Sequence, residues 1–372
     1  MKKIIIIGAG ILGATTAYRL AKAGEDVTII DQQIPGRATQ VASGIICPWL
    51  SKRRNQAWYK LAKHGAKLYP ELVKELTEDG QKNTGYKRTG ALFLRNSKEK
   101  LQAFKQSALV RREEAPEIGE ITLLNPQQAT AIFPPLQEAY GAVHIAGGAR
   151  VDGGRLVHSL LEATKMYGAR IIKGQAMLQQ KEDTVWGVEV NEKTIEADAV
   201  IAVNGAWMRP LLAEIGIDFL GSFQKGQLVH LRTSQSDTSD WPVVLPPSGQ
   251  SIVSFDDHLV IGASHENDAS FDARITVGAM QDVLTKALTF APGLAQAEIT
   301  TTKYGFRPFT PDFLPIFGPI PELKGLFIAN GLGASGMTTG PFIATTLADI
   351  VRGKRPAINV DDYTTAGAIR TK

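Results

Sequence analysis

The sequence contains very little cysteine, because Cys47 is the one thiol among 372 residues. A single thiol excludes an internal disulfide and a cysteine-cluster metal site, so we expect no bound metal. The lack of disulfides also fits a reducing compartment. We therefore expect the protein in the cytoplasm.

Long apolar runs and an excess of one charge are missing as well. No segment approaches the roughly twenty apolar residues that a transmembrane helix needs, so we expect no membrane-spanning segment. The formal net charge is only +4. The short run Lys52-Arg53-Arg54 favours a solvated surface over a nucleic-acid patch, and we expect no nucleic-acid partner.

A glycine-rich turn near the start carries the strongest signal. The β-branched run Ile4 to Ile7 predicts a strand buried on both faces of a parallel sheet. Gly8 permits a tight turn, Gly10 lets the backbone approach a pyrophosphate, and Gly13 lets the next helix pack closely on the strand. A second apolar strand ends at Asp31, whose carboxylate can accept hydrogen bonds from a ribose. An incidental glycine loop is the alternative, but the complete βαβ context favours dinucleotide binding.

The order of the predicted elements divides the chain into two domains. Alternation of strands and helices in three separated pieces predicts a Rossmann-like nucleotide-binding domain of residues 1–85, 140–218 and 305–372. Short alternating strands predict an inserted, mainly antiparallel substrate-binding domain of residues 86–139 and 219–304. The predicted fold class is therefore α/β plus α+β.

Periodicity and turn signals also predict the individual elements. Expected helices span residues 55–80, 97–110, 155–167, 276–289 and 336–352. Expected strands span residues 90–95, 121–124, 141–145, 169–172, 185–190, 193–196, 199–203, 227–232, 251–255, 259–262, 299–304 and 326–329.

Five stretches match a known family in order and separation: Gly8 to Asp31, Gly36 to Gly44, Asp198 to Trp207, Tyr304 to Gly318, and Phe327 to Gly340. Together they resemble the D-amino-acid oxidase family of FAD-dependent oxidoreductases, and within it the glycine oxidases and D-amino-acid dehydrogenases. The resemblance implies FAD, with its ADP half on the first βαβ unit and its isoalloxazine ring between the domains. Some relatives tether the flavin to a cysteine. Lys303 and Tyr304 stand in that region here, so we expect non-covalent FAD.

The resemblance also implies a set of cofactor-binding residues on strand ends and loops. The set comprises Gly8, Gly10, Ile11, Leu12, Gly13, Asp31, Gln32, Arg37, Ala38, Thr39, Ser43, Gly44, Ile45, Met177, Gly205, Gly331, Leu332, Gly333, Ala334, Ser335, Gly336, Met337 and Thr338. Met177 would touch the adenine region. A helix beginning near Gly336 would aim its N–H groups at the pyrimidine edge of the flavin. The alternative is a helix N-terminus that Ser335 caps for stability alone.

Arg307 is the expected substrate-binding residue. In the family the arginine of this Arg-Pro step holds the substrate carboxylate with two parallel hydrogen bonds, which suit a planar guanidinium. From the sequence alone, a structural salt bridge between Arg307 and Asp312 is about equally plausible.

The expected substrate walls differ from those of glycine oxidases. Gln250 stands in place of an aromatic residue, His265 in place of a methionine, and Ala334 in place of an arginine. These differences favour a larger or more polar amino acid than glycine. His265 would interact with the substrate side chain or amine, although a lone histidine after a strand is often only a surface residue.

The implied reaction is oxidation of the C–N bond of a small amino acid or secondary amine. Hydride transfer to the flavin gives an imine, which hydrolyses to a 2-oxo acid. Two alternatives stay open: a 2-hydroxy-acid dehydrogenase or oxidase on the same fold, and a non-catalytic flavin-binding module. The electron acceptor is oxygen or a quinone or carrier protein, since no lysine stands on the strand where sarcosine oxidases place one. The oligomeric state is open too, a homo-oligomer included.

Overall fold

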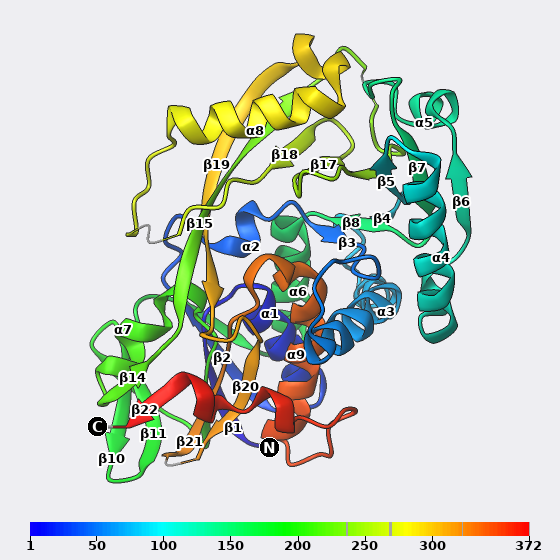
Figure 1. The fold of residues 1–372 in the computed structure, drawn as a ribbon. Coiled ribbons are helices and arrows are strands. Elements are labelled where there is room, and N and C mark those ends of the chain that lie inside the picture. Colours follow the sequence, from blue (N-terminus) through cyan, green and yellow to red (C-terminus); the bar gives the residue numbers. More distant parts are fainter. Residues whose placement is uncertain (236, 268–269, 322, 372) are drawn as a thin grey trace.

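The structure is a computed structural model that describes residues 1–235, 237–267, 270–321 and 323–371. Two large sheets dominate the fold, one around β1 in the lower half of Figure 1 and one around β15 and β19 in the upper half. Segments far apart in the sequence contribute to each sheet.

The lower sheet has a parallel core. β1 (Lys3–Ile7) pairs in parallel with β2 and β13. Its isoleucines are buried because α1 and α9 cover one face of the sheet, while β10, β11 and α7 cover the other. The strand order is β10-β11-β21-β13-β1-β2-β9. The other strands are β2 (Asp26–Asp31), β9 (Arg170–Lys173), β10 (Met177–Lys181), β11 (Thr184–Val190), β12 (Lys193–Glu196), β13 (Ala199–Ala202), β20 (Ile316–Ile320) and β21 (Leu323–Asn330).

Four long helices pack beside this sheet. They are α1 (Ile11–Lys22), α3 (Gln56–Glu78), α6 (Gly153–Met166) and α9 (Gly336–Val351). α1 contacts α6 and α9, and α3 contacts α9. A Cβ on Gly65 of α3 would collide with the carbonyl of Thr338, and a Cβ on Gly340 would lie 2.9 Å from Ile11. These close approaches place the N-terminus of α9 near that of α1.

The upper sheet is mainly antiparallel. Its strand order is β19-β15-β18-β17-β16-β5-β7-β6, and the β16–β5 pair is parallel. The strands are β5 (Ala91–Arg95), β6 (Ile121–Leu124), β7 (Gly141–Ile145), β15 (Ser222–Arg232), β16 (Val243–Leu245), β17 (Ser251–Ser254), β18 (Leu259–Gly262) and β19 (Glu298–Phe309). Its helices are α4 (Lys98–Glu114), α5 (Pro126–Ile132) and α8 (Val277–Phe290).

The structure corrects the predicted domain boundary at residue 140. β7 pairs with β5 and β6 of the upper sheet, so residues 141–145 do not belong to the nucleotide-binding domain. The apolar pattern predicts a strand here correctly. The pattern does not show which sheet the strand joins, because a buried strand has the same apolar sequence pattern in a parallel and in an antiparallel sheet.

Smaller elements connect the two sheets. β8 (Ala149–Val151) lies between β3 (Ile45–Ile46) and β4 (Tyr86–Arg88), and β14 (Ile217–Phe219) pairs with β22 (Ile369–Thr371). The short helices are α2 (Ala38–Val41), α7 (Met208–Ala213), η1 (Pro116–Ile118), η2 (Gly205–Trp207), η3 (Pro292–Gln296), η4 (Gly333–Ser335), η5 (Asp361–Tyr363) and η6 (Thr365–Ala368).

Among the helices described, none is both long and apolar enough to cross a bilayer. The cytoplasmic location stays a prediction.

A half-buried histidine in the upper sheet makes the stability of the fold sensitive to acid. Burial lowers the pKa of His230 to about 4, and the charges of Lys303 and His258 add to this effect. An unfolded histidine titrates near pH 6.5, so the unfolded chain binds more protons as the pH falls from about 6.5 to about 4. We expect this site to remove about 1–2 kcal/mol of folding free energy over that range, after allowance for solvent screening.

Thermal unfolding of His230→Gln at pH 7 and pH 5 measures this effect. The variant should lose less stability between the two pH values than the unchanged protein does. His158→Gln, at an exposed position on α6, is the matched control. An equal loss in all three proteins would contradict the assignment to His230.

Candidate active site

A cavity of about 580 Å³ lies between the two sheets. Most of the predicted cofactor and substrate residues line it. They are Gly8, Gly10, Ile11, Leu12, Asp31, Gln32, Arg37, Ala38, Thr39, Ser43, Gly44, Ile45, Gly205, Gln250, His265, Arg307, Leu332, Gly333, Ala334, Gly336 and Met337. The structure thus brings together residues from both domains.

Five of the predicted residues do not line the cavity. Gly13 packs instead: a Cβ there would collide with the carbonyl oxygen of Gly8. Gly331 has a φ of +80° and lies against Thr310. Met177 is 40% exposed, and its neighbour Ala176 lines the cavity in its place. The prediction that the Met177 side chain contacts the adenine therefore has no support in the structure.

Ser335 and Thr338 act through hydrogen bonds behind the cavity wall. The Ser335 hydroxyl accepts from Trp58 Nε1 at 2.9 Å and donates to the Leu332 carbonyl at 3.0 Å. The Thr338 hydroxyl donates to the Ile45 carbonyl at 2.9 Å. Both side chains therefore hold neighbouring wall segments in place.

Arg53 contributes to the same support. Its guanidinium lies 4.9 Å from the centre of the Trp58 ring and donates to the carbonyl of Phe313. Burial lowers the pKa of Arg53. Lys52 and Arg54 are exposed as predicted, but Arg53 is part-buried, so the basic run is not only a solvated surface.

The dinucleotide end of the cavity is built from the first βαβ unit. Gly8 has a φ of +106°, which the tight turn requires. α1 begins without a side-chain cap and has no acidic residue in its first turn. Its positive N-terminal end therefore faces the cavity at Gly10, Ile11 and Leu12, as a pyrophosphate needs.

Asp31 makes more contacts than the sequence predicted. Its carboxylate accepts hydrogen bonds from the backbone N–H groups of Ala9 and Gln33, both at 2.7 Å. Arg37 forms an ion pair with it at 3.1 Å. Both residues line the cavity, and no spacing rule could have predicted their ion pair.

The N-terminus of α9 forms another wall of the cavity. Gly336 and Met337 line it, and α9 also begins without a side-chain cap hydrogen bond. The alternative reading, that Ser335 caps this helix, is therefore not what the structure has. The free N–H groups suit a ligand edge that gains negative charge.

Arg307 lies at the substrate end on β19. Its guanidinium crosses over Gly226, where any Cβ would collide with it. Nη1 donates to Gln224 Oε1 and to the Ser264 carbonyl, both at 3.1 Å. Burial lowers the pKa of Arg307 to about 10, and the nearby Glu266 opposes this shift, so the side chain stays charged at neutral pH.

No ion pair joins Arg307 to a carboxylate within the described part of the chain, Asp312 included. A half-buried guanidinium whose hydrogen-bond partners are neutral suits an anionic ligand, because a charge that is partly removed from water gains from a counter-charge. Sequence reasoning missed Gln224, the neutral partner that holds the guanidinium. It reaches Arg307 only through the pairing of β15 with β19.

Gln250 and His265 complete the substrate end. Gln250 is 5% exposed, and neither amide atom has a partner among the described residues. His265 Nδ1 lies 3.0 Å from Gln224 Oε1 and 3.5 Å from Arg307 Nη1. Burial of part of the ring and the charge of Arg307 lower the pKa of His265, although the residue as a whole is exposed.

The cavity fits FAD on its own geometry. It has a glycine cradle, two helix N-termini and a buried, unpartnered Asn204 Oδ1 in the described structure. The sequence indicated Asn204 only as a polar residue after a buried strand. Cys47 is buried outside the cavity lining, and burial raises the pKa of its thiol.

Comparisons with known proteins agree with this geometry. A family model described as DAO, FAD dependent oxidoreductase, matches residues 3–350. The oxidoreductase YurR of Bacillus subtilis is 52% identical over 99% of this chain and 100% of its own. The crystal structure of iminodiacetate oxidase from Chelativorans sp. BNC1 is 40% identical, with a TM-score of 0.94 over 97% of this chain and 98% of that one.

Glycine oxidase from Geobacillus kaustophilus is more distant. It is 26% identical, with a TM-score of 0.85 over 98% of both chains. The predicted family, fold class and FAD cofactor are therefore confirmed. The chain belongs to the DAO family of FAD-dependent oxidoreductases.

Proposed function

We propose that this protein oxidises the C–N bond of a small amino acid or secondary amine that carries a carboxylate. The observation that carries the proposal is Arg307, a half-buried cation that lines the cavity and whose hydrogen-bond partners among the described residues are neutral. The likeness to iminodiacetate oxidase and glycine oxidase supports an amine as the donor.

The residues of the chain bind and orient the substrate. FAD, when bound, supplies an acceptor for the hydride that leaves the α-carbon. Arg307 holds the carboxylate, and Gln224 and Ser264 fix the guanidinium that does so. Leu228 and Leu245 line the cavity and keep water from the reacting carbon. The imine that forms then hydrolyses to a 2-oxo acid and an amine.

Gln250 favours a substrate with a second polar group. Its buried amide has both a donor and an acceptor without a protein partner in the described structure, and a ligand can satisfy them. Iminodiacetate, which the 40% identical neighbour is named for, has such a second carboxylate. Sarcosine has only one, so the two compounds separate the roles of Arg307 and Gln250.

We expect Gln250→Leu to raise KM for iminodiacetate about 10- to 100-fold, because a hydrogen bond to a charged group contributes about 1.5–3 kcal/mol. KM for sarcosine should change less than about threefold, since it does not need the second contact. Steady-state kinetics with both compounds measures the difference. Ser254→Ala, a buried and unpartnered hydroxyl on the same sheet outside the cavity lining, is the control. Equal effects on both substrates would contradict a role for Gln250 in the second contact.

The proposed reaction class is tested by anaerobic titration of the purified FAD-loaded protein. The panel contains glycine, sarcosine, iminodiacetate, D- and L-amino acids and 2-hydroxy acids. Loss of the oxidised flavin absorbance with an amine, and one equivalent of 2-oxo acid per flavin, is the expected result. Loss with 2-hydroxy acids alone would favour the alternative alcohol oxidoreductase. No loss with any compound would favour a flavin-binding module without turnover.

A separate experiment identifies the acceptor that takes electrons from the reduced flavin. Stopped-flow mixing of the reduced enzyme with oxygen distinguishes an oxidase, which reoxidises fast, from a dehydrogenase that uses a quinone or carrier protein. The cavity lining includes no lysine among the described residues.

A further inference from the structure

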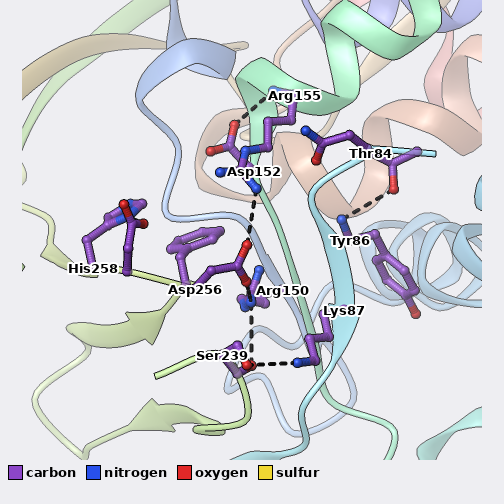
Figure 2. A network of polar contacts seen from close by, with 12 residues as sticks. Thr84, Tyr86, Lys87, Arg150, Asp152, Arg155, Ser239, Asp256 and His258 are labelled. Atoms are coloured by element: carbon purple, nitrogen blue, oxygen red, sulfur yellow. Dashed lines mark hydrogen bonds and ion pairs between the residues drawn. The ribbon is translucent and has the colours of Figure 1, made fainter. Parts of the chain in front are cut away.

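A polar cluster joins the three-stranded sheet β3-β8-β4 and helix α6 to the β17–β18 hairpin of the upper sheet. Figure 2 shows Arg150 from β8 and Arg155 from α6 pointing toward Asp256, with Ser239 and Lys87 nearby. Arg150 Nη2 lies 2.8 Å from one oxygen of Asp256, and Arg155 Nη1 lies 3.3 Å from the other. Two arginines of the cofactor-binding side therefore hold one carboxylate of the substrate-binding side.

Arg150 is tied to the cofactor end of the cavity through its backbone. It is the register partner of Ile45 in the β3–β8 pair, and Ile45 lines the cavity. The adjacent Val151 N–H donates to the Gly44 carbonyl at 2.8 Å, and Gly44 also lines the cavity. Any movement of β8 is therefore transmitted to the cavity wall at residues 44 and 45.

The guanidinium of Arg150 is buried against the other sheet. Its side chain is 3% exposed, and it lies 4.7 Å from the centre of the Phe255 ring. Nε has no partner among the described residues. A charge so buried depends strongly on Asp256, because the carboxylate is its one counter-ion in the described structure.

Asp256 stands at the turn of the β17–β18 hairpin, which spans residues 251–262. The other end of this hairpin reaches the cavity: Ser251 pairs with Gly262, and both line it, as do Gln250 and Ala263 beside them. The hairpin is about 10 Å long from Ser251 to Ser254. A paired hairpin of this length moves as one unit, so a displacement of its turn also displaces the residues at its cavity end.

We infer that Arg150 is a positioning residue: by binding Asp256 it fixes the β17–β18 hairpin, and with it the substrate end of the cavity, against the cofactor end. Arg150 itself touches neither end. It acts through Ile45 on one side and through Asp256 on the other. Hydride transfer depends on this spacing, because misplacement of the reacting atoms by about 1 Å can cost about 100-fold in rate.

The kinetic part of this inference rests on the proposed function, whereas the fixed hairpin does not. The experiment therefore has three readouts on the FAD-loaded protein. Hydrogen–deuterium exchange reports the hairpin amides, and anaerobic stopped-flow reports the limiting rate of flavin reduction by the best substrate of the panel. An absorbance titration with acetate gives the Kd of a simple carboxylate. The variants are Asp256→Asn, which keeps the shape of the side chain, and Arg150→Lys, which keeps the charge but loses the planar fork.

Both variants should exchange the amides of residues 251–262 about ten times faster, while those of β1 and α1 stay unchanged. The limiting rate should fall about tenfold or more, and Kd for acetate should change less than about threefold, because Arg307 is intact. The control is Asp240→Asn, which removes an ion pair with Lys87 in the same cluster at a side chain 88% exposed. It should leave all three quantities unchanged.

Unchanged exchange in the hairpin would overturn the inference, and so would faster exchange with an unchanged reduction rate. If no compound reduces the unchanged enzyme, the proposed function fails. The exchange comparison then decides alone whether Arg150 and Asp256 fix the hairpin.

Discussion

Arg307→Ala is expected to lower kcat/KM for a carboxylate-bearing amine by about a thousandfold. The guanidinium can make two charge-assisted hydrogen bonds to the carboxylate, each contributing about 1.5–3 kcal/mol. About 1.4 kcal/mol corresponds to a factor of ten in rate, so two such bonds account for about 100- to 10,000-fold. Both KM and kcat should change, because the same contacts orient the α-carbon.

Two comparisons make this result specific to the carboxylate. The unchanged enzyme should prefer a substrate acid strongly over its primary amide, and Arg307→Ala should lose that preference. Arg307→Lys should recover only part of the activity, since an ammonium cannot reproduce the two parallel bonds. FAD content and melting temperature show that each variant is folded. Arg232→Ala, at an exposed arginine of the neighbouring strand β15, is the control. If folded Arg307→Ala has an unchanged kcat/KM, Arg307 does not bind the substrate carboxylate.

Gly13→Ala is expected to abolish FAD binding. A Cβ at residue 13 would collide with the carbonyl oxygen and carbon of Gly8, and these backbone atoms cannot move without opening the turn after β1. Overpacking costs about 1–3 kcal/mol where side chains can adjust, and a collision with backbone costs more. The purified variant should hold little flavin, or it should fail to fold.

Two other glycines, which have more space at the Cβ position, serve as comparisons for this prediction. A Cβ on Gly10 would lie 3.3 Å from Thr39 Oγ1, so Gly10→Ala should weaken FAD binding without preventing folding. Gly278 of α8 has open space around the Cβ position, and Gly278→Ala should leave flavin content unchanged. Flavin absorbance per protein and melting temperature measure all three. Full flavin content in Gly13→Ala would contradict the close packing of the turn.

Local sequence patterns predicted the elements but not always their partners. The buried runs at residues 4–7 and 199–203 identified strands of the parallel core, because a strand covered on both faces needs apolar side chains throughout. Residues 141–145 have the same pattern and join the other sheet. β19 extends to Phe309, beyond the predicted residue 304, because its pairing with β15 continues. The pattern of a half-exposed strand end cannot show such pairing.

In the candidate site, too, local motifs were predictable and contacts between distant residues were not. The glycine turn was predictable from a motif with a physical reason. The family resemblance pointed to Arg307, which lines the cavity, and its contact with a substrate stays a prediction. The contacts of Asp31 with Arg37 and of Arg307 with Gln224 join residues through loop geometry and strand register, which periodicity does not encode. Met177 lies at an exposed strand position, and its neighbour Ala176 lines the cavity, so the contact of Met177 with the adenine stays a prediction.

One anaerobic experiment tests whether the enzyme oxidises an amine that it holds by the carboxylate. The FAD-loaded enzyme is mixed with sarcosine or iminodiacetate and, in parallel, with glycolate, which keeps the carboxylate but replaces nitrogen with oxygen. We predict rapid loss of the oxidised flavin absorbance with at least one of the amines, formation of one equivalent of 2-oxo acid, and no loss with glycolate. Loss with glycolate and with neither amine would contradict the account.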